Sequence, residues 1–437
     1  MENRILKHSR IMKNKLKILF LMLLISSVSV VGQTKTPPTF EEYIKTAVPT
    51  KTELDVFLHK KGVWSKFDSE LGYVLGNSLP LEGIDTSCTI STTQANGART
   101  MFMYKDKPCR INTYGDSFTQ CQQVSDGETW QEYLAAHLGE PVRNYGVGGY
   151  GVYQAYLRLL REEKTKNAAK YLVFYIWGGD HTRSLLRCRY IATKDWNSRN
   201  EPGMKFHGNF WPNLEMDLNT GTFIEKKNPL NTTKLIYKMT DKDWMYNQLK
   251  DDIALQLLLY RNRKISDLDI EKAQKLSNYL HLNISLKDSA NLENAVIDLL
   301  DSYSFAATEY ILNKLKIYAA KNDKKLLVVL FDTYRVTNSM IVNGTRYDGQ
   351  MVDFLLKGNF NYFDMNLVHV NDFKRYNLSL DDYYKIYFLG HYNPTGNHFF
   401  AYSIKNTIVK WLDPKPITYE KSDKKWVDFN GYLQGVK

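Results

Sequence analysis

The amino-acid sequence predicts an α/β fold: a three-layer α/β/α sandwich with a central, mostly parallel sheet, enlarged by an insertion of helices and loops. Three observations support this class. Apolar runs of strand length, clearest at residues 171–177 and 325–332, alternate with stretches that have apolar residues at helical spacing. These runs lack an alternating polar face, which is typical of strands covered on both sides. The alternation of strands and helices is interrupted from about residue 185 to about residue 300. We therefore interpret this stretch as the insertion.

The strands and helices of the predicted domain, residues 106–412, each follow from a local pattern. The first two extended runs lead directly into glycines, where a strand gives way to a turn. Apolar residues three and four positions apart predict the helices. We expect strands at 110–114, 142–145, 171–177, 325–332 and 362–365, and helices at 128–138, 152–161, 304–320 and 395–412.

Other segments surround this domain or interrupt it. Residues 33–105 form an N-terminal segment that packs on the domain, helical over 39–60 and loop-like over the Gly-, Ser- and Thr-rich stretch 72–97. Residues 413–437 form a C-terminal tail. Helices are expected within the insertion at 244–262 and 292–301.

Composition and charge exclude several classes of protein. The chain has 437 residues, of which 43% are hydrophobic and 24% charged, and this excludes a disordered or collagen-like protein. The formal net charge of +11 raises the question of a nucleic-acid or membrane partner. Much of that excess lies in residues 1–32, and no basic run interleaved with aromatic residues follows. We therefore expect no nucleic-acid partner.

The N-terminus has the layout of a secretory signal peptide, which we predict over residues 1–32. Six basic residues precede the uncharged apolar run 18–31, and small residues follow. This run is shorter than the roughly 20 residues that span a bilayer, so we expect no stable membrane span after signal removal. The predicted location is the periplasm, the cell surface or the exterior, with an uncleaved N-terminal anchor as the alternative.

Export would place the cysteines in an oxidising compartment. Their spacing matches no zinc-binding pattern. Either they form one or two disulfide bridges, or they remain buried thiols. A bridge at Cys121 would brace the segment around Ser117. The four residues are Cys88, Cys109, Cys121 and Cys188.

Three short motifs carry the candidate chemistry. The first, Gly115-Asp116-Ser117, follows an extended run, and an open α/β sheet places reacting groups at the ends of its strands. The second is a glycine cluster at 146–151, whose backbone N–H groups could bind an oxyanion. The third places His391 just before a helix, where it could act as the general base for a serine nucleophile. His398, inside that helix, is interpreted as structural.

In combination, the three motifs resemble those of the SGNH/GDSL hydrolase family. The resemblance covers residues of about 110–184 and 304–412 and implies the flavodoxin-like SGNH hydrolase fold. It implies that Ser117 is the nucleophile and also donates its backbone N–H to the oxyanion hole. It implies that Gly149 is a second oxyanion donor and that His391 is the general base. The resemblance implies no metal and no organic cofactor.

Two positions depart from the family pattern. Asp180 stands where the family has an oxyanion-binding asparagine, so either a protonated Asp180 or its neighbour His181 would have to donate. The family aspartate three residues before the catalytic histidine is replaced by Phe388. His391 would then be oriented by a backbone carbonyl, would act in a Ser–His dyad, or would be oriented by a carboxylate elsewhere. The candidate carboxylates are Asp180, Asp381 and Asp382.

The resemblance implies a carboxylic ester hydrolase that works through an acyl-enzyme. The chain is rich in aromatic residues, with 30 Tyr and 8 Trp, and such rings suit sugar binding. We therefore expect a secreted esterase that removes O-acyl groups, most simply acetyl, from a polysaccharide. One alternative is a lipase-like hydrolase of lipids or small esters. The other is a weakly active or non-catalytic glycan-binding or cell-envelope protein on the same fold.

Overall fold

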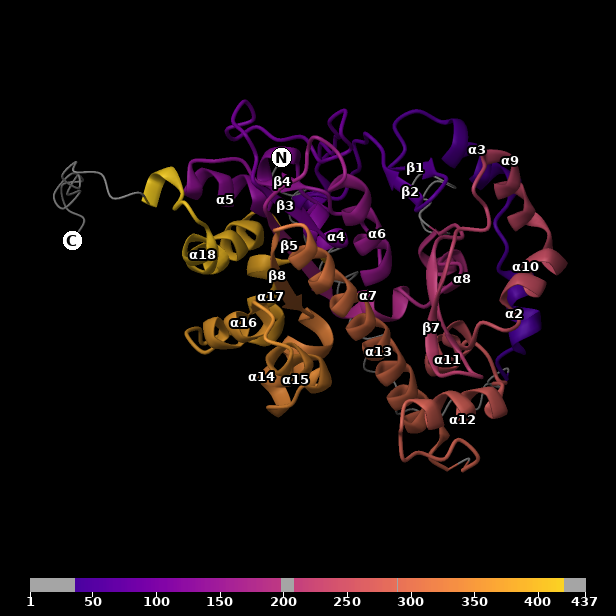
Figure 1. The fold of residues 1–437 in the computed structure, drawn as a ribbon. Helices are drawn as coiled ribbons and strands as arrows, with labels where there is room; N and C mark the ends of the chain where they lie inside the picture. Colours follow the sequence, from indigo (N-terminus) through magenta and orange to yellow (C-terminus); the bar gives the residue numbers. More distant parts are fainter. Residues whose placement is uncertain (1–35, 198–207, 289, 420–437) are drawn as a thin grey trace, which may run out of the picture. The chain divides into compact units, whose positions relative to one another are not determined.

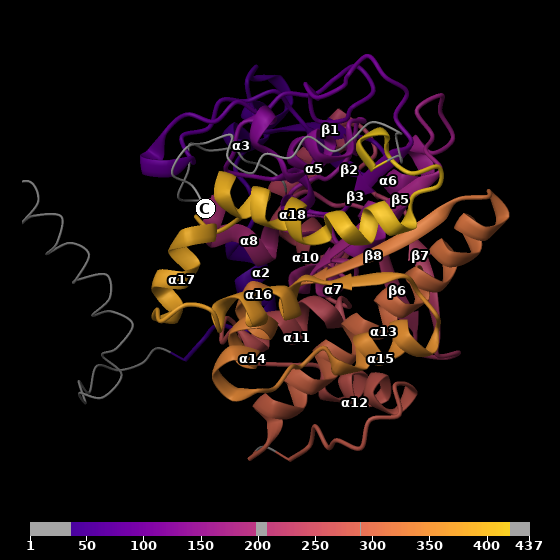
Figure 2. The same ribbon diagram turned by 90° about the vertical axis from the view of Figure 1, so that its left-hand side faces the viewer.

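A five-stranded sheet, parallel throughout, forms the centre of the molecule (Figures 1 and 2). The structure is a computed structural model that describes residues 36–197, 208–288 and 290–419. The predicted signal peptide and residues 420–437 of the predicted tail lie outside this range. The sheet confirms the predicted α/β class. Its strands, in spatial order, are β4 (Arg143–Asn144), β3 (Ile111–Tyr114), β5 (Tyr171–Trp177), β8 (Lys325–Phe331) and β9 (Tyr362–Asp364).

Two long apolar strands make up the middle of the sheet, as the sequence predicted. β5 and β8 pair in register from Tyr171 opposite Lys325 to Trp177 opposite Phe331. Alternate side chains of β5 enter two different hydrophobic clusters, because successive residues of a strand point to opposite faces. Val173 belongs to one cluster and Phe174 to the other, and both are fully buried. Each face of the sheet is therefore covered.

Helices form the two outer layers. On one face, α5 (Trp130–Leu138) and α18 (Pro394–Trp411) pack against each other and against the sheet. On the other face, α6 (Val152–Glu162) and α13 (Leu292–Lys321) take that place. Asn393 caps α18 by accepting a hydrogen bond from the N–H of Gly396, with Pro394 at the first turn.

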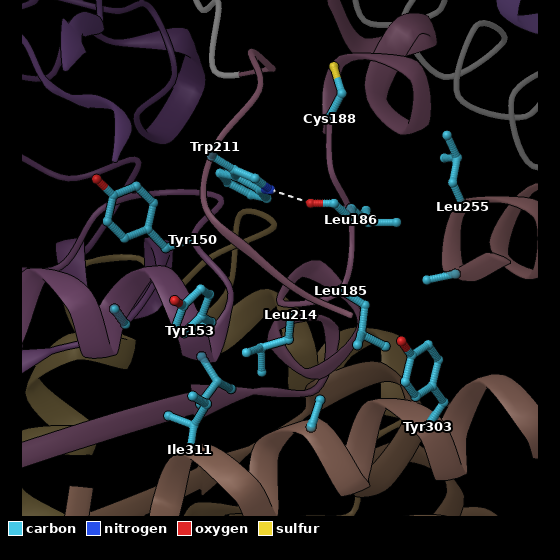
Figure 3. Packing of buried hydrophobic residues seen from close by; sticks show 14 of the residues in the cluster. Tyr150, Tyr153, Leu185, Leu186, Cys188, Trp211, Leu214, Leu255, Tyr303 and Ile311 are labelled. Carbon is cyan, nitrogen blue, oxygen red and sulfur yellow. Dashed lines mark hydrogen bonds between the residues drawn. The ribbon is translucent and has the colours of Figure 1, made fainter. Parts of the chain in front are cut away.

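The insertion shares the core of the sheet domain. Trp211 and Leu214 lie in the same hydrophobic cluster as Tyr150, and the indole N–H of Trp211 donates to the carbonyl of Leu186 at 2.6 Å (Figure 3). Helix α13 runs from the insertion to the sheet, where it contacts β8 (Figure 1). The insertion contains α8 (Tyr190–Asn197), β6 (Asn213–Asp217), β7 (Thr222–Lys226), α9 (Thr233–Ile236), α10 (Lys242–Leu249), α11 (Ile253–Arg261) and α12 (Ile270–Tyr279).

Several predicted elements have other boundaries in the structure. The helix predicted over 39–60 is two helices, α2 (Phe40–Thr46) and α3 (Lys51–His59), because Pro49 cannot continue a helix. The helix predicted over 244–262 is likewise divided, since Asp252 caps a new helix there. The helices predicted at 292–301 and 304–320 are one continuous helix, α13.

Short antiparallel strands were not predicted. The stretch predicted as a loop over 72–97 begins with β2 (Gly72–Leu75), which pairs with β1 (Ser65–Asp68). β6 and β7 form a second antiparallel pair in the insertion. Four further α-helices lie between β8 and α18 in the sequence: α14 (Asn338–Asn343), α15 (Gly349–Lys357), α16 (Met365–Phe373) and α17 (Leu380–Tyr387).

The prediction of disulfide bridges is wrong, because all four cysteines are free thiols. Cys121 and Cys188 are buried, and burial raises the pKa of each thiol to about 12. The thiol of Cys121 contacts Gln131 Oε1 at 3.3 Å. These two cysteines therefore act as buried side chains, the alternative that the sequence left open. Across the described ranges, none of the helices is both long and apolar enough for a membrane span.

Candidate active site

The chain topology brings two loops together at the carboxyl edge of the sheet. β3 is the first strand of the sheet in the sequence, β4 lies on one side of it, and β5 lies on the other. The connections after β3 and β5 therefore leave in opposite directions, which opens the crevice where such folds bind ligands. α4 (Ser117–Gln120) follows β3, and α7 (Gly178–Arg183) follows β5.

Ser117 occupies the first turn after β3. A side chain at Gly115 would place its Cβ 2.7 Å from the carbonyl oxygen of Tyr175, so only glycine allows β3 to turn so closely beside β5. Asp116 caps the short helix by accepting a hydrogen bond from the N–H of Phe118 at 2.9 Å. The hydroxyl of Ser117 lies 3.2 Å from Asp116 Oδ2.

His391 lies next to Ser117, although 274 residues separate them in the sequence. Nε2 of His391 is 2.8 Å from Oγ of Ser117, the distance needed for general-base catalysis. The imidazole ring packs on Phe118 with ring centroids 5.0 Å apart. The structure thus brings the predicted nucleophile and the predicted base into hydrogen-bond contact.

The group that orients His391 is a glutamine. Oε1 of Gln123 lies 3.1 Å from Nδ1 of His391 and also accepts the backbone N–H of His391 at 2.7 Å. The other end of the same amide, Nε2, donates to the carbonyl of Leu389 at 3.2 Å. This arrangement fixes the amide with its oxygen toward Nδ1, so Nδ1 carries the proton and Nε2 accepts from Ser117.

The predicted orienting carboxylates do not hold that position. Asp381 and Asp382 are exposed on the first turn of α17, where Asp382 bonds to Ser379 and Lys385. Asp180 accepts hydrogen bonds from the N–H of Trp177 and from Arg183. The described contacts of these three carboxylates thus run to other groups, and a neutral amide from the nucleophile segment lies at Nδ1 of His391.

Gln123 offers a direct test of this arrangement. Gln123→Glu would put a negative charge beside Nδ1 and stabilise the imidazolium, so the acid limb of the profile of kcat/KM against pH should move to higher pH by about one unit or more. The measurement is the hydrolysis rate of a chromogenic acetate ester between pH 5 and 9.

Gln122→Glu is the matched control. Gln122 is the residue before Gln123, and its side chain donates a hydrogen bond to Glu82. The control should leave the acid limb in place. An equal shift in both variants, or none in Gln123→Glu, would contradict the assigned role of Gln123.

Asp180 is fully buried and neighbours a second carboxylate. Burial, followed by the negative charge of Asp116, raises the pKa of Asp180 well above its usual value. Its two oxygens contact the N–H of Trp177 at 2.9 Å and Nη1 of Arg183 at 2.8 Å. Asp180 therefore holds Arg183 and the start of α7.

His181 does not supply an oxyanion donor. Its Nδ1 lies 2.8 Å from the hydroxyl of Thr308 on α13, and its ring packs against Phe305. Burial lowers the pKa of His181 to about 4. His398, which was predicted to be structural, is exposed on α18, and its ring centroid lies 5.3 Å from that of Tyr133 and 6.1 Å from that of His137 on α5.

The glycine cluster contains a backbone donor that is not used within the described residues. Gly149 has a φ of +83°, and its N–H has no acceptor among the described residues. The N–H of Gly148 is used, since it donates to Gln120 Oε1 at 2.7 Å. Gly149 is thus suited to bind an oxyanion. Within the described ranges, no group of His, Cys, Asp and Glu is arranged to hold a metal ion.

No family model matches the chain, and no curated protein matches it. The architecture is thus given by the structure, and the family stays a proposal that depends on the motifs and their geometry.

Sequence reasoning missed three residues of this site. Gln123 carries no motif that marks it. Arg189, whose Nη1 lies against Gly149, belongs to the insertion, outside the stretch that resembles the family. Arg183 could have been found, because it follows Asp180 by three positions directly after a predicted strand, and an acid and a base three positions apart face each other on a helix.

Proposed function

We propose that the protein is a secreted serine esterase of the SGNH/GDSL type that removes O-acyl groups, most simply acetyl, from a carbohydrate. The observation that carries the proposal is the contact of 2.8 Å between Ser117 Oγ and His391 Nε2, with Gln123 behind His391. The order of the three motifs and their place at the carboxyl edge of the sheet support it further.

The geometry supports an acyl-enzyme mechanism. Ser117 Oγ attacks the ester carbonyl while its proton passes to Nε2 of His391. The N–H groups of Ser117 and Gly149 hold the oxyanion that forms. Collapse of this intermediate expels the alcohol, which takes the proton from His391. Water then attacks the acyl-serine with His391 again as base, and the acid is released.

The surroundings of the site favour a sugar as the alcohol part of the substrate. Tyr334 is 52% exposed, and its hydroxyl donates to the carbonyl of Gly390, the residue before His391. An exposed aromatic ring with a polar tip next to the base is suited to stacking on a sugar ring. The predicted signal peptide supports export, where polysaccharides are available.

The experiment is a substrate panel on the purified mature chain. Acetate release from acetylated xylan and pectin is compared with hydrolysis of chromogenic esters of increasing acyl length. The proposal predicts acetate release from at least one polymer and a falling rate as the acyl chain lengthens. A preference for long chains would favour the lipase-like alternative. Absence of ester hydrolysis together with retained glycan binding would favour the non-catalytic alternative.

A further inference from the structure

Four charged side chains form a cluster beside Ser117 and Gly149. Two are carboxylates, Asp116 and Asp180, and two are guanidinium groups, Arg183 and Arg189. Asp116, Asp180 and Arg189 are almost completely buried, and the side chain of Arg183 is 13% exposed. Buried charges are costly unless they are paired, so a cluster of this kind at a candidate active site points to a function.

Arg183 lies within reach of the nucleophile. Its Nη1 contacts Asp180 Oδ1 at 2.8 Å and Asp116 Oδ2 at 3.6 Å. The same Asp116 Oδ2 lies 3.2 Å from Oγ of Ser117. The guanidinium and the serine hydroxyl therefore share one carboxylate oxygen. An acyl group attached to Ser117 would lie beside a positive charge.

The guanidinium is held in place and still has donors to offer. Arg183 stacks on the indole of Trp177 with its guanidinium carbon 4.9 Å from the ring centroid, and Trp177 stacks on Phe118 next to Ser117. All its hydrogen bonds to the described residues run through Nη1. Nε and Nη2 are left for a ligand, in the rigid planar arrangement that arginine gives.

Acyl transfer at Ser117 requires a positively charged hydrogen-bond donor in this cluster. The two carboxylates accept hydrogen bonds and would repel a developing oxyanion if nothing offset them. Burial raises the pKa of Asp116 and of Asp180, which reduces that repulsion. Arg189 adds positive charge beside Gly149, the proposed backbone donor, because its Nη1 occupies the place where a Cβ on Gly149 would lie.

We propose that Arg183 is the side-chain donor to the tetrahedral oxyanion, at the place where the resembled family uses an asparagine, and that Asp180 positions it. This inference rests on the proposed esterase function. As the bond between Ser117 Oγ and the ester carbon forms, the carbonyl π electrons move to oxygen, and Arg183 donates an N–H to that oxygen. When the intermediate collapses, the electron pair returns and the alcohol leaves.

The test compares Arg183→Met and Arg183→Lys with the wild type. Kinetics on a chromogenic acetate ester are paired with inhibition by phenylboronic acid, which forms an anionic tetrahedral adduct on a serine nucleophile. Loss of one oxyanion donor lowers kcat by about 10²–10³-fold, so Arg183→Met should show a loss of that size, with KM changed little. The inhibition constant for the boronic acid should weaken in parallel.

Two variants guard against a folding defect. Arg183→Lys keeps the positive charge in the cluster, and we expect a folded protein whose kcat is reduced because lysine lacks the planar fork. Arg187→Met is the matched control, since Arg187 pairs with Glu215 and Gln248 away from Ser117. It should keep the wild-type kcat and the wild-type inhibition constant.

The outcomes separate this inference from the proposed function. Wild-type activity that persists in Arg183→Met overturns the inference alone. Wild-type boronate affinity in a folded but slow Arg183→Met also overturns it, because the arginine would then affect the rate only through a structural role. A wild-type protein without esterase activity overturns the proposed function and this inference together.

Discussion

Replacement of Ser117 by alanine is expected to lower ester hydrolysis by about 10⁴-fold or more, since removal of a serine nucleophile eliminates the covalent route. The fold should remain intact, because the hydroxyl makes a contact of 3.2 Å with Asp116 and one of 2.8 Å with His391 and otherwise fills little space. The measurement is kcat/KM on a chromogenic acetate ester, together with the melting temperature.

Ser78→Ala is the matched control for this variant. Ser78 is 7% exposed and Ser117 is 6% exposed, so the two serines are equally buried. The hydroxyl of Ser78 has no hydrogen-bond partner within the described residues, and its removal should change neither rate nor stability by much. Substantial activity in Ser117→Ala would contradict the assignment of the nucleophile.

Replacement of Gly149 by alanine is expected to destabilise the fold through both a steric clash and an unfavourable backbone conformation. The new Cβ would overlap Nη1 of the buried Arg189, and the φ of +83° is unfavourable for alanine. Overpacking costs about 1–3 kcal/mol, and left-handed backbone costs a similar amount. Activity should also fall, since the donor N–H of Gly149 would shift.

Gly344→Ala separates the steric effect from the backbone effect. Gly344 has a φ of +70°, and a Cβ there would meet nothing within 4 Å. Both variants carry the backbone penalty, and only Gly149→Ala carries the clash. Urea unfolding should therefore show Gly149→Ala less stable than Gly344→Ala by about 1–3 kcal/mol. Equal stability of the two variants would mean that Arg189 does not press on Gly149.

The central strands were predictable because the pattern that identifies them lies within each strand's own sequence. β5 and β8 are apolar on both faces, and such runs are distinctive in a sequence. The two-stranded sheets were missed because their strands are only four or five residues long and β7 has no fully buried residue. Helix α13 was divided in the prediction, although its apolar residues continue through the predicted break.

The site residues that stand in sequence motifs were predictable. Those that are defined only by tertiary contacts were not. Ser117 and His391 stand in recognisable motifs, and the structure brings them into contact. Gln123 could not be inferred, because its role depends on how the loop before α18 folds back onto the nucleophile segment. The sequence left two alternatives open for the cysteines, since export alone does not bring two thiols within bonding distance, and the structure has free thiols.

Capture of the acyl-enzyme tests the central claim most directly. The purified protein is mixed with an activated acetate ester, quenched in acid within the first turnovers, digested and analysed by mass spectrometry. We expect one acetyl group on the peptide that contains Ser117, and none on that peptide in Ser117→Ala. An ester hydrolysed by the wild type without any acetylated Ser117, or with the acetyl group on another residue, would contradict that claim.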